Sequence, residues 1–216
     1  MRKHLIAANW KMFKTPTEAN AFLTTFLPLV SQQSHTEIVL CPAMTSLAAT
    51  IAAAAGSNAH VGAQTMHWLD SGAYTGETSP TMLKAIGATH VLIGHSERRQ
   101  YFNETDTTVN LKLKAALAHG LIPIVCVGEH LEERESDLTA KVLELQTAVA
   151  LEGIDAATAA PIVFAYEPVY HRHRAHRHPA DRRAGTQAHP QPDRLIPHPG
   201  HRCLNPHPVR WLRQAR

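Results

Sequence analysis

The sequence predicts an α/β fold with a parallel sheet, and three observations support this prediction. Short apolar runs alternate with longer amphipathic stretches and recur roughly every 20 to 40 residues. The short runs are nearly continuous in Val, Ile, Leu and Ala, as is typical of parallel strands buried on both faces. The longer stretches begin with helix-capping residues and carry apolar residues at helical spacing. The pattern alone does not distinguish a doubly wound sheet from a barrel.

Six strands are predicted, and each is one of the short apolar runs. A (β/α)8 barrel needs eight strands and typically about 250 residues, so the pattern supplies two strands fewer than a complete barrel. The predicted strands span His4–Asn9, Glu37–Cys41, Ala59–Ala63, His90–Gly94, Ile122–Val127 and Pro161–Glu167.

Three helices are predicted between these strands. The first covers Pro16–Val30, because Thr15 can cap it and proline is favoured at the first helical position. The second covers Thr105–His119 and stops at Gly120. The third ends at Gly153 and carries an apolar stripe formed by Leu138, Val142, Leu145 and Val149.

The chain changes character at Val169/Tyr170, where we place a boundary. Residues 1–169 hold 11 basic and 16 acidic residues, hence a charge of −5. Residues 170–216 hold ten Arg and two Asp, hence +8, and these values give the overall +3. The second segment also contains eight of the 16 His and seven of the 14 Pro. It lacks periodic apolar faces and cannot offset its chain entropy by burial, so we predict disorder for 170–216.

The composition argues against several classes of protein. The three cysteines, Cys41, Cys126 and Cys203, are odd in number and far apart, so we expect neither a disulfide framework nor a metal site. The first residues are too poor in apolar side chains for a signal peptide, and no run approaches 18 apolar residues. These features predict a cytoplasmic protein.

Four polar residues at the ends of predicted strands form the candidate site. Asn9 and Lys11 follow the first strand, His95 follows the fourth at a predicted helix start, and Glu167 ends the sixth. Because the carboxyl ends of parallel strands meet at one edge, we expect these side chains to converge there. An amide, a cation, an imidazole and a carboxylate together suit proton transfer on a small anionic substrate.

Each of these residues also has a simpler interpretation. Lys11 can be a solvated surface lysine, His95 can cap the following turn, and Glu167 can be an ordinary loop acid before a proline. The charged run 97–99 can be a helix start. Only their common placement at strand ends favours the catalytic interpretation.

Five motifs stand out in the first 169 residues: Ala8–Met12, Gly62–Gln64, Gly72–Glu77, Ile93–Arg99 and Ala165–Val169. In order and in spacing they resemble the triosephosphate isomerase family. The resemblance implies a (β/α)8 TIM barrel of which only the first six β/α units are encoded in frame.

The resemblance also implies an activity and the role of each residue in it. The family interconverts dihydroxyacetone phosphate and D-glyceraldehyde 3-phosphate through an enediolate, in glycolysis and gluconeogenesis, with no cofactor or metal. Glu167 is expected to remove the proton and His95, in its neutral form, to polarise the carbonyl. Lys11 is expected to stabilise phosphate and enediolate charge, and Asn9 to help position the substrate.

Further roles follow from the resemblance alone. Glu97, Ser96 and Cys126 are expected to support the site. The loop 64–77 is expected to reach into a neighbouring subunit, with Thr75 approaching its active site. A homodimer acting on a small triose phosphate is therefore implied, without a nucleic-acid or membrane partner. The residues assigned to the dimer contact are Gln64, Thr75, Gly76, Glu77 and Arg98.

After Val169 the sequence departs from the family, which continues with an aromatic residue and the lid Ala-Ile-Gly-Thr-Gly. This chain reads Tyr170 and then the His- and Arg-rich run 171–179. A family-like stretch written in G/C-rich codons yields that run when its first two bases are removed. The family's seventh-strand motif Arg-Ile-Leu-Tyr-Gly-Gly-Ser-Val-Lys-Pro, read in the same shifted frame, yields residues 206–215. We therefore predict a reading-frame shift after about residue 170.

The shift predicts that this chain has little or no isomerase activity. Strands seven and eight would be absent, together with the phosphate-binding loops that follow them. The first and sixth strands would expose unpaired edges. Two alternatives remain: the basic segment 170–216 could bind nucleic acid or anions non-specifically, or the chain could pair with an intact subunit.

Overall fold

The computed structural model describes residues 3–168 and 209–211, and in these residues strands and helices alternate along the chain. The strands are β1 His4–Asn9, β2 Thr36–Cys41, β3 Ala59–Ala63, β4 His90–Ile93, β5 Ile122–Val127, β6 Val163–Tyr166 and β7 Val209–Trp211. The helices are α1 Pro16–Val30, α2 Met44–Ala54, α3 Pro80–Ala85, α4 Ser96–Tyr101, α5 Asp106–Ala118, α6 Leu131–Glu135 and α7 Thr139–Leu151.

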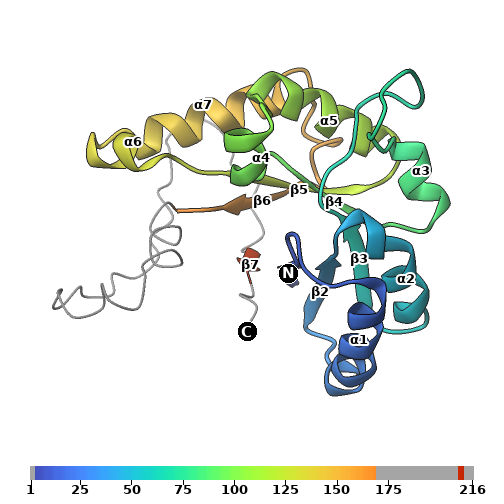
Figure 1. The fold of residues 1–216 in the computed structure, drawn as a ribbon. Coiled ribbons are helices and arrows are strands. Elements are labelled where there is room, and N and C mark those ends of the chain that lie inside the picture. Colours follow the sequence, from blue (N-terminus) through green and yellow to red (C-terminus); the bar gives the residue numbers. More distant parts are fainter. Residues whose placement is uncertain (1–2, 169–208, 212–216) are drawn as a thin grey trace, which may run out of the picture.

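The strands form one parallel sheet in the order β6-β5-β4-β3-β2-β1-β7. The sheet curls, and its helices lie on the outer side, with α1 and α2 beside β1–β3 and α5 and α7 over β4–β6 (Figure 1). The predicted architecture is therefore confirmed: the six predicted strands form the first part of a TIM barrel. No helix in the described ranges is both long and apolar enough to cross a membrane.

Both faces of the sheet are buried, which explains why the strands read as continuous apolar runs. One set of alternating residues packs on the inner, concave face, whereas the residues between them pack beneath the helices. Small side chains are common on the inner face, as the limited space inside a curled sheet requires. The inner set consists of Leu5, Ala7, Val39, Cys41, Leu92, Ile124, Cys126, Val163 and Ala165.

The predicted elements lie close to the observed ones, but β4 ends at Ile93 instead of Gly94 and β6 is shorter at both ends. β6 begins at Val163 instead of Pro161, because residues 155–161 form turns in which Asp155 accepts hydrogen bonds from the Ala157 and Thr158 amides. The helices α2, α3 and α6 were not predicted. At the carboxyl end of β4, His95 caps α4, as the predicted helix start required.

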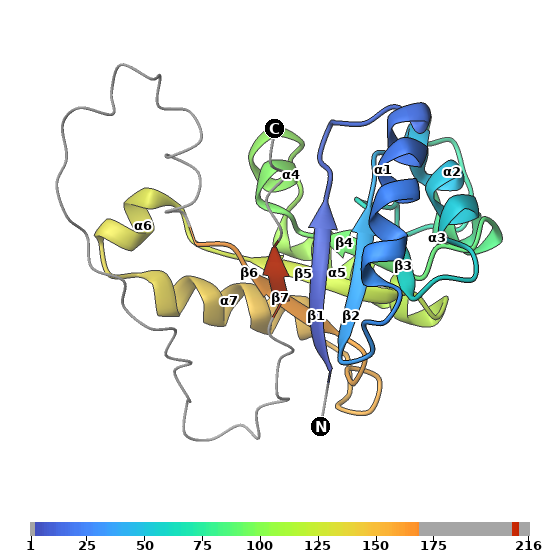
Figure 2. The same cartoon turned by 90° about the horizontal axis from the view of Figure 1, so that it is seen from below.

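The edge of β1 is paired, which corrects an expectation from the sequence. Leu5, Ile6 and Ala7 lie in parallel register with Val209, Arg210 and Trp211 of β7 (Figure 2). The predicted disorder of 170–216 is therefore wrong at these three residues. Valine and tryptophan favour strands, and an open sheet edge offers unpaired amides and carbonyls to any extended segment nearby. The other residues of 170–216, on which the predicted nucleic-acid binding depends, lie outside the described residues.

Candidate active site

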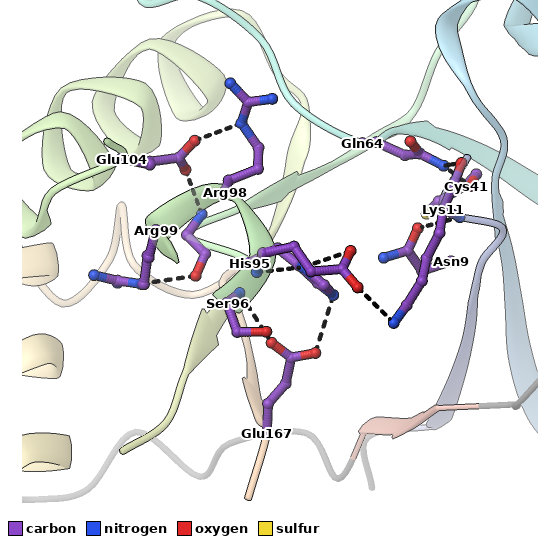
Figure 3. A network of polar contacts seen from close by, with 12 residues as sticks. Asn9, Lys11, Cys41, Gln64, His95, Ser96, Arg98, Arg99, Glu104 and Glu167 are labelled. Atoms are coloured by element: carbon purple, nitrogen blue, oxygen red, sulfur yellow. Dashed lines mark hydrogen bonds and ion pairs between the residues drawn. The ribbon is translucent and has the colours of Figure 1, made fainter. Parts of the chain in front are cut away.

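The candidate site lies at the carboxyl ends of β1, β4 and β6, as the sequence predicts (Figure 3). His95 follows β4 by two residues and is 5% exposed. The turn before it is made by Gly94, whose φ of +74° is readily adopted only by glycine. A Cβ at Gly94 would also meet the Val109 side chain and the Cys126 carbonyl at 3.0 Å. The turn thus directs the imidazole across the strand ends toward β6.

His95 and Glu167 form the centre of the site. The Nε2 atom of His95 lies 3.0 Å from Oε1 of Glu167. The second carboxylate oxygen, Oε2, accepts a hydrogen bond of 3.1 Å from the backbone amide of Ser96. Both oxygens of the predicted base are therefore held by the turn that begins α4. Ser96 contributes to the site through its main chain as well as by its position.

The hydrogen bonds of His95 define which ring nitrogen carries the proton. The backbone amide of Glu97 donates to Nδ1 at 3.2 Å, so Nδ1 acts as an acceptor. A neutral imidazole with an accepting Nδ1 carries its proton on Nε2, which faces Glu167. This tautomer can donate a hydrogen bond to a substrate oxygen that replaces the carboxylate.

Glu167 is ionised in this arrangement. Burial alone would raise its pKa, but the contacts with His95 and the hydrogen bonds of Ser96 outweigh burial and lower the pKa from 4.5 to about 2. The Glu167 side chain is 21% exposed, so a substrate proton can reach it. A carboxylate with so low a pKa is a weak base, and its contacts must loosen before it removes a proton.

Lys11 is held in an unusual backbone conformation by two neighbours. Its φ is +53°, which is uncommon for a residue with a side chain. Its amide donates to Oδ1 of Asn9 at 2.9 Å. Its carbonyl accepts from Nε2 of Gln64 at 2.9 Å, and the same Gln64 nitrogen donates to the Cys41 carbonyl at 2.9 Å. Gln64 therefore positions Lys11 within the same chain.

The Glu97 carboxylate lies between Lys11 and the His95–Glu167 pair. Nζ of Lys11 lies 2.7 Å from Oε1 of Glu97. Oε2 of Glu97 lies 3.7 Å from Nδ1 of His95. Figure 3 shows Lys11, His95 and Glu167 converging from the ends of β1, β4 and β6. The four residues combine a cation, a general base and a neutral donor around one position at the strand ends.

A buried carboxylate behind the site was missed by the sequence analysis. Glu104, whose side chain is 2% exposed, accepts from the Gly94 amide at 2.6 Å and from Nε of Arg98 and Nζ of Lys112 at 2.8 Å each. Burial would raise the pKa of Glu104, but Lys112, Gly94 and Arg98 lower it overall. The only sequence signal for this role is an acidic residue directly before the cap Thr105, which is a weak one.

The remaining predicted residues divide into two groups. Cys126 is fully buried on the inner face, where burial raises the pKa of its thiol well above the usual range, and its supporting role stays a prediction. Thr75, Gly76 and Glu77 are exposed on the loop between β3 and α3, and their expected contact with a neighbouring subunit stays a prediction. Arg98, assigned to the dimer contact, bonds Glu104 of its own chain, and its part in a dimer stays a prediction. Among the described residues no group of three His, Cys, Asp or Glu side chains could hold a metal ion.

Comparison with known proteins agrees with this geometry. The family described as "Triosephosphate isomerase" matches residues 4–171. The chain belongs to the triosephosphate isomerase family. The resemblance inferred from the motifs, the TIM-barrel fold and the assignment to an isomerase family are thereby confirmed.

Relatives within the triosephosphate isomerase family match the same part of the chain. The triosephosphate isomerases of Solibacter usitatus and Citrifermentans bemidjiense are each 54% identical over 170 residues, which is 79% of this chain and 68% of each relative. The crystal structure of triosephosphate isomerase from Bartonella henselae superposes with a TM-score of 0.72 at 42% identity, over 78% of this chain and 69% of that one.

Proposed function

We propose that this chain interconverts dihydroxyacetone phosphate and D-glyceraldehyde 3-phosphate, at a rate far below that of the relatives it matches. The observation that supports this proposal best is the His95–Glu167 pair at 3.0 Å, joined to Lys11 through Glu97. These groups are the ones that moving a proton next to a carbonyl requires.

The proposed reaction uses the same groups in both directions. The Glu167 carboxylate takes a proton from the carbon next to the carbonyl, and the C–H electron pair becomes the double bond of an enediolate. The Nε2–H of His95 donates to the carbonyl oxygen as negative charge develops there, and the Lys11 ammonium stabilises that charge and the phosphate. His95 then gives its Nε2 proton to the former carbonyl oxygen and takes up the proton of the neighbouring hydroxyl. Glu167 returns its proton to the former carbonyl carbon, so that the carbonyl now lies on the other carbon and the isomerisation is complete.

The low rate follows from the chain beyond Val169. The family match ends close to this position, at residue 171. In TIM barrels the phosphate is bound by loops after strands seven and eight. Binding energy from the phosphate is used to close the site and exclude water. Without those loops we expect a loss of several orders of magnitude in kcat/KM.

The proposal is tested by proton exchange, which detects slow chemistry. Dihydroxyacetone phosphate is incubated in D2O with the purified 216-residue chain, and deuterium incorporation is followed by proton NMR. We expect exchange above the buffer rate, and a roughly 10²- to 10⁴-fold loss of that excess in Glu167→Gln because the general base is removed. Glu144→Gln, on the exposed side of α7, is the matched control and should exchange like the parent.

Exchange at the buffer rate by a chain with a folded circular dichroism spectrum would reject the proposed activity. The rival hypothesis, that the basic segment 170–216 binds nucleic acid, is tested on the same chain. If the chain stays bound to a DNA column at physiological salt, nucleic-acid binding is favoured. If the chain elutes at modest salt, the nucleic-acid hypothesis is rejected.

The proposal includes a homodimer. Its support is a group of exposed apolar side chains near the site: Met12 is 93%, Phe13 62% and Phe102 64% exposed. The loop 64–79, which the resemblance assigns to the subunit contact, is stiffened by His67, whose ring stacks on Trp68 at 4.1 Å and lies 4.2 Å from Tyr74. Sedimentation equilibrium tests this part, and a monomer at micromolar concentration would contradict it. A cytoplasmic location remains part of the proposal.

A further inference from the structure

The end of β5 is held by a side chain that no part of the proposed chemistry uses. Gln146 lies on α7, outside the sheet, and its amide oxygen accepts from the Gly128 amide at 2.9 Å. Its amide nitrogen donates to the Gly128 carbonyl at 3.0 Å. A glutamine amide has the same donor and acceptor pair as a peptide group. Gln146 therefore bonds both main-chain groups of Gly128 as a neighbouring strand would.

Gly128 lies directly against the main chain of Glu167. A Cβ atom at Gly128 would lie 2.4 Å from the Glu167 carbonyl oxygen, closer than any side chain allows. The β5–β6 ladder pairs Val127 with Tyr166, and the Glu167 amide continues it with a 2.9 Å bond to the Val127 carbonyl. The backbone that carries the Glu167 carboxylate is thus fixed by the position of the Gly128 peptide.

A second set of hydrogen bonds joins the residues next to Gly128 and Glu167, but it does not involve the Gly128 peptide. The Tyr166 hydroxyl donates to Oε1 of Glu129 at 3.1 Å, and Arg134 reaches the same oxygen at 2.8 Å. These bonds hold Tyr166 and Glu129 but make no contact with the Gly128 peptide groups. The Gln146 amide is the contact that fixes the orientation of this peptide within the described residues.

We infer that Gln146 is a positioning residue for the general base, acting through the Gly128 peptide on the main chain of Glu167. The inference rests on the proposed function, because positioning matters only if Glu167 removes a proton. A small displacement of a reacting group is costly, since misplacement by about 1 Å can lower a rate by roughly 10²-fold. Gln146 touches neither substrate nor reacting atoms.

Three variants test the inference. Gln146→Leu removes both hydrogen bonds at nearly constant volume. Gly128→Ala forces a Cβ toward the Glu167 carbonyl without altering α7, so it remains informative if Gln146→Leu does not fold. Glu144→Gln, on the same helix, is the control. We expect the first two to lower kcat for proton exchange roughly 10- to 100-fold with KM within about twofold, and the control to change neither.

A second readout separates this inference from the proposed activity. The carboxyl carbon of Glu167 is followed by NMR between pH 2.5 and 6. In the parent chain it should remain ionised throughout, whereas in Gln146→Leu and Gly128→Ala we expect a titration midpoint at least about one pH unit higher, because the contacts with His95 and Ser96 loosen.

Each outcome decides a different point. An unchanged Glu167 titration in a folded Gln146→Leu variant overturns the positioning role, and so does an equal change in Glu144→Gln. A raised Glu167 titration midpoint in Gln146→Leu and Gly128→Ala, together with a parent chain that shows no exchange, would support positioning and reject the proposed function.

Discussion

The charge of a single carboxylate, Glu167, depends on two neighbours at the start of α4. His95 and the Ser96 amide each hold one of its oxygens. These contacts outweigh burial and keep the carboxylate ionised. The same contacts connect the chemistry of the site to the stability of the fold, because a group whose pKa differs between folded and unfolded chains makes stability depend on pH.

We predict that Glu167 makes the chain less stable in acid. Its folded pKa of about 2 lies below the ordinary 4.5, so its contribution is fully present above pH 4.5 and is lost as the pH falls toward 2. The size of this contribution is roughly 2–3 kcal/mol. The measurement is the free energy of urea unfolding between pH 2.5 and 6, for the parent and for Glu167→Gln. The parent should lose more stability than the variant, and parallel curves would contradict this prediction.

At the scale of an element, α1 shows how local sequence defines a boundary. The Thr15 hydroxyl accepts from the Glu18 amide at 3.4 Å, and the Glu18 carboxylate accepts from the Thr15 amide at 2.8 Å. This capping box satisfies amides that have no partner within the helix. Pro16 occupies the first turn, where its missing N–H costs nothing. The helix then buries Ala19 and Leu23 against β1 and β2.

We expect Thr15→Ala to lower the free energy of unfolding by about 1 kcal/mol, because it removes the side chain that caps α1. Thr17→Ala, at an exposed position of the same helix, should change stability by less than about 0.5 kcal/mol. Urea unfolding of both variants checks the prediction, which fails if the two changes are equal.

The strands and long helices were predictable because their patterns are local. All six predicted strands exist, and Pro16–Val30 is the helix that its cap and proline indicated. The helices α3, α4 and α6 have five or six residues, too few to show a helical period. The helix α2 is rich in alanine and lacks a polar face that would reveal its period. These elements are fixed by tertiary packing more than by their own sequence.

The site was predictable only in part, for a related physical reason. Lys11, His95 and Glu167 stand at strand ends, where topology alone brings side chains together. The partners that hold them depend on contacts between distant segments, such as Gln64 with Lys11 and Gln146 with Gly128. The sequence around a helical glutamine does not reveal whether its side chain bonds a distant peptide group or is exposed to solvent.

At the scale of the whole molecule, the sheet has two ends where a barrel has none. β6 stands at one end of the hydrogen-bonded order of the described strands and β7 at the other. β7 covers three residues of β1, whose edge groups would otherwise be free to pair with another chain. Three paired residues are a short addition, but they lie beside the inner core residues Leu5 and Ala7.

We predict that β7 protects the chain from self-association. A chain ending at residue 208 lacks β7, whereas one ending at residue 211 retains it and is the matched control. The shorter chain should aggregate faster, as measured by light scattering at equal concentration, because its β1 edge can pair with other molecules. Equal rates would mean that the β1–β7 pairing contributes nothing to solubility.

The backbone at position 11 also bears on how such a chain evolves. A lysine at φ +53° costs about 1–3 kcal/mol, whereas glycine or asparagine occupies this region more easily. If Lys11 acts in turnover as proposed, selection for turnover keeps the ammonium in spite of that cost, and stability and catalysis then oppose each other at one codon. In a lineage where turnover no longer matters, drift at this codon should favour glycine or asparagine. The residue at position 11 among close relatives would then record whether purifying selection still acts on the active site.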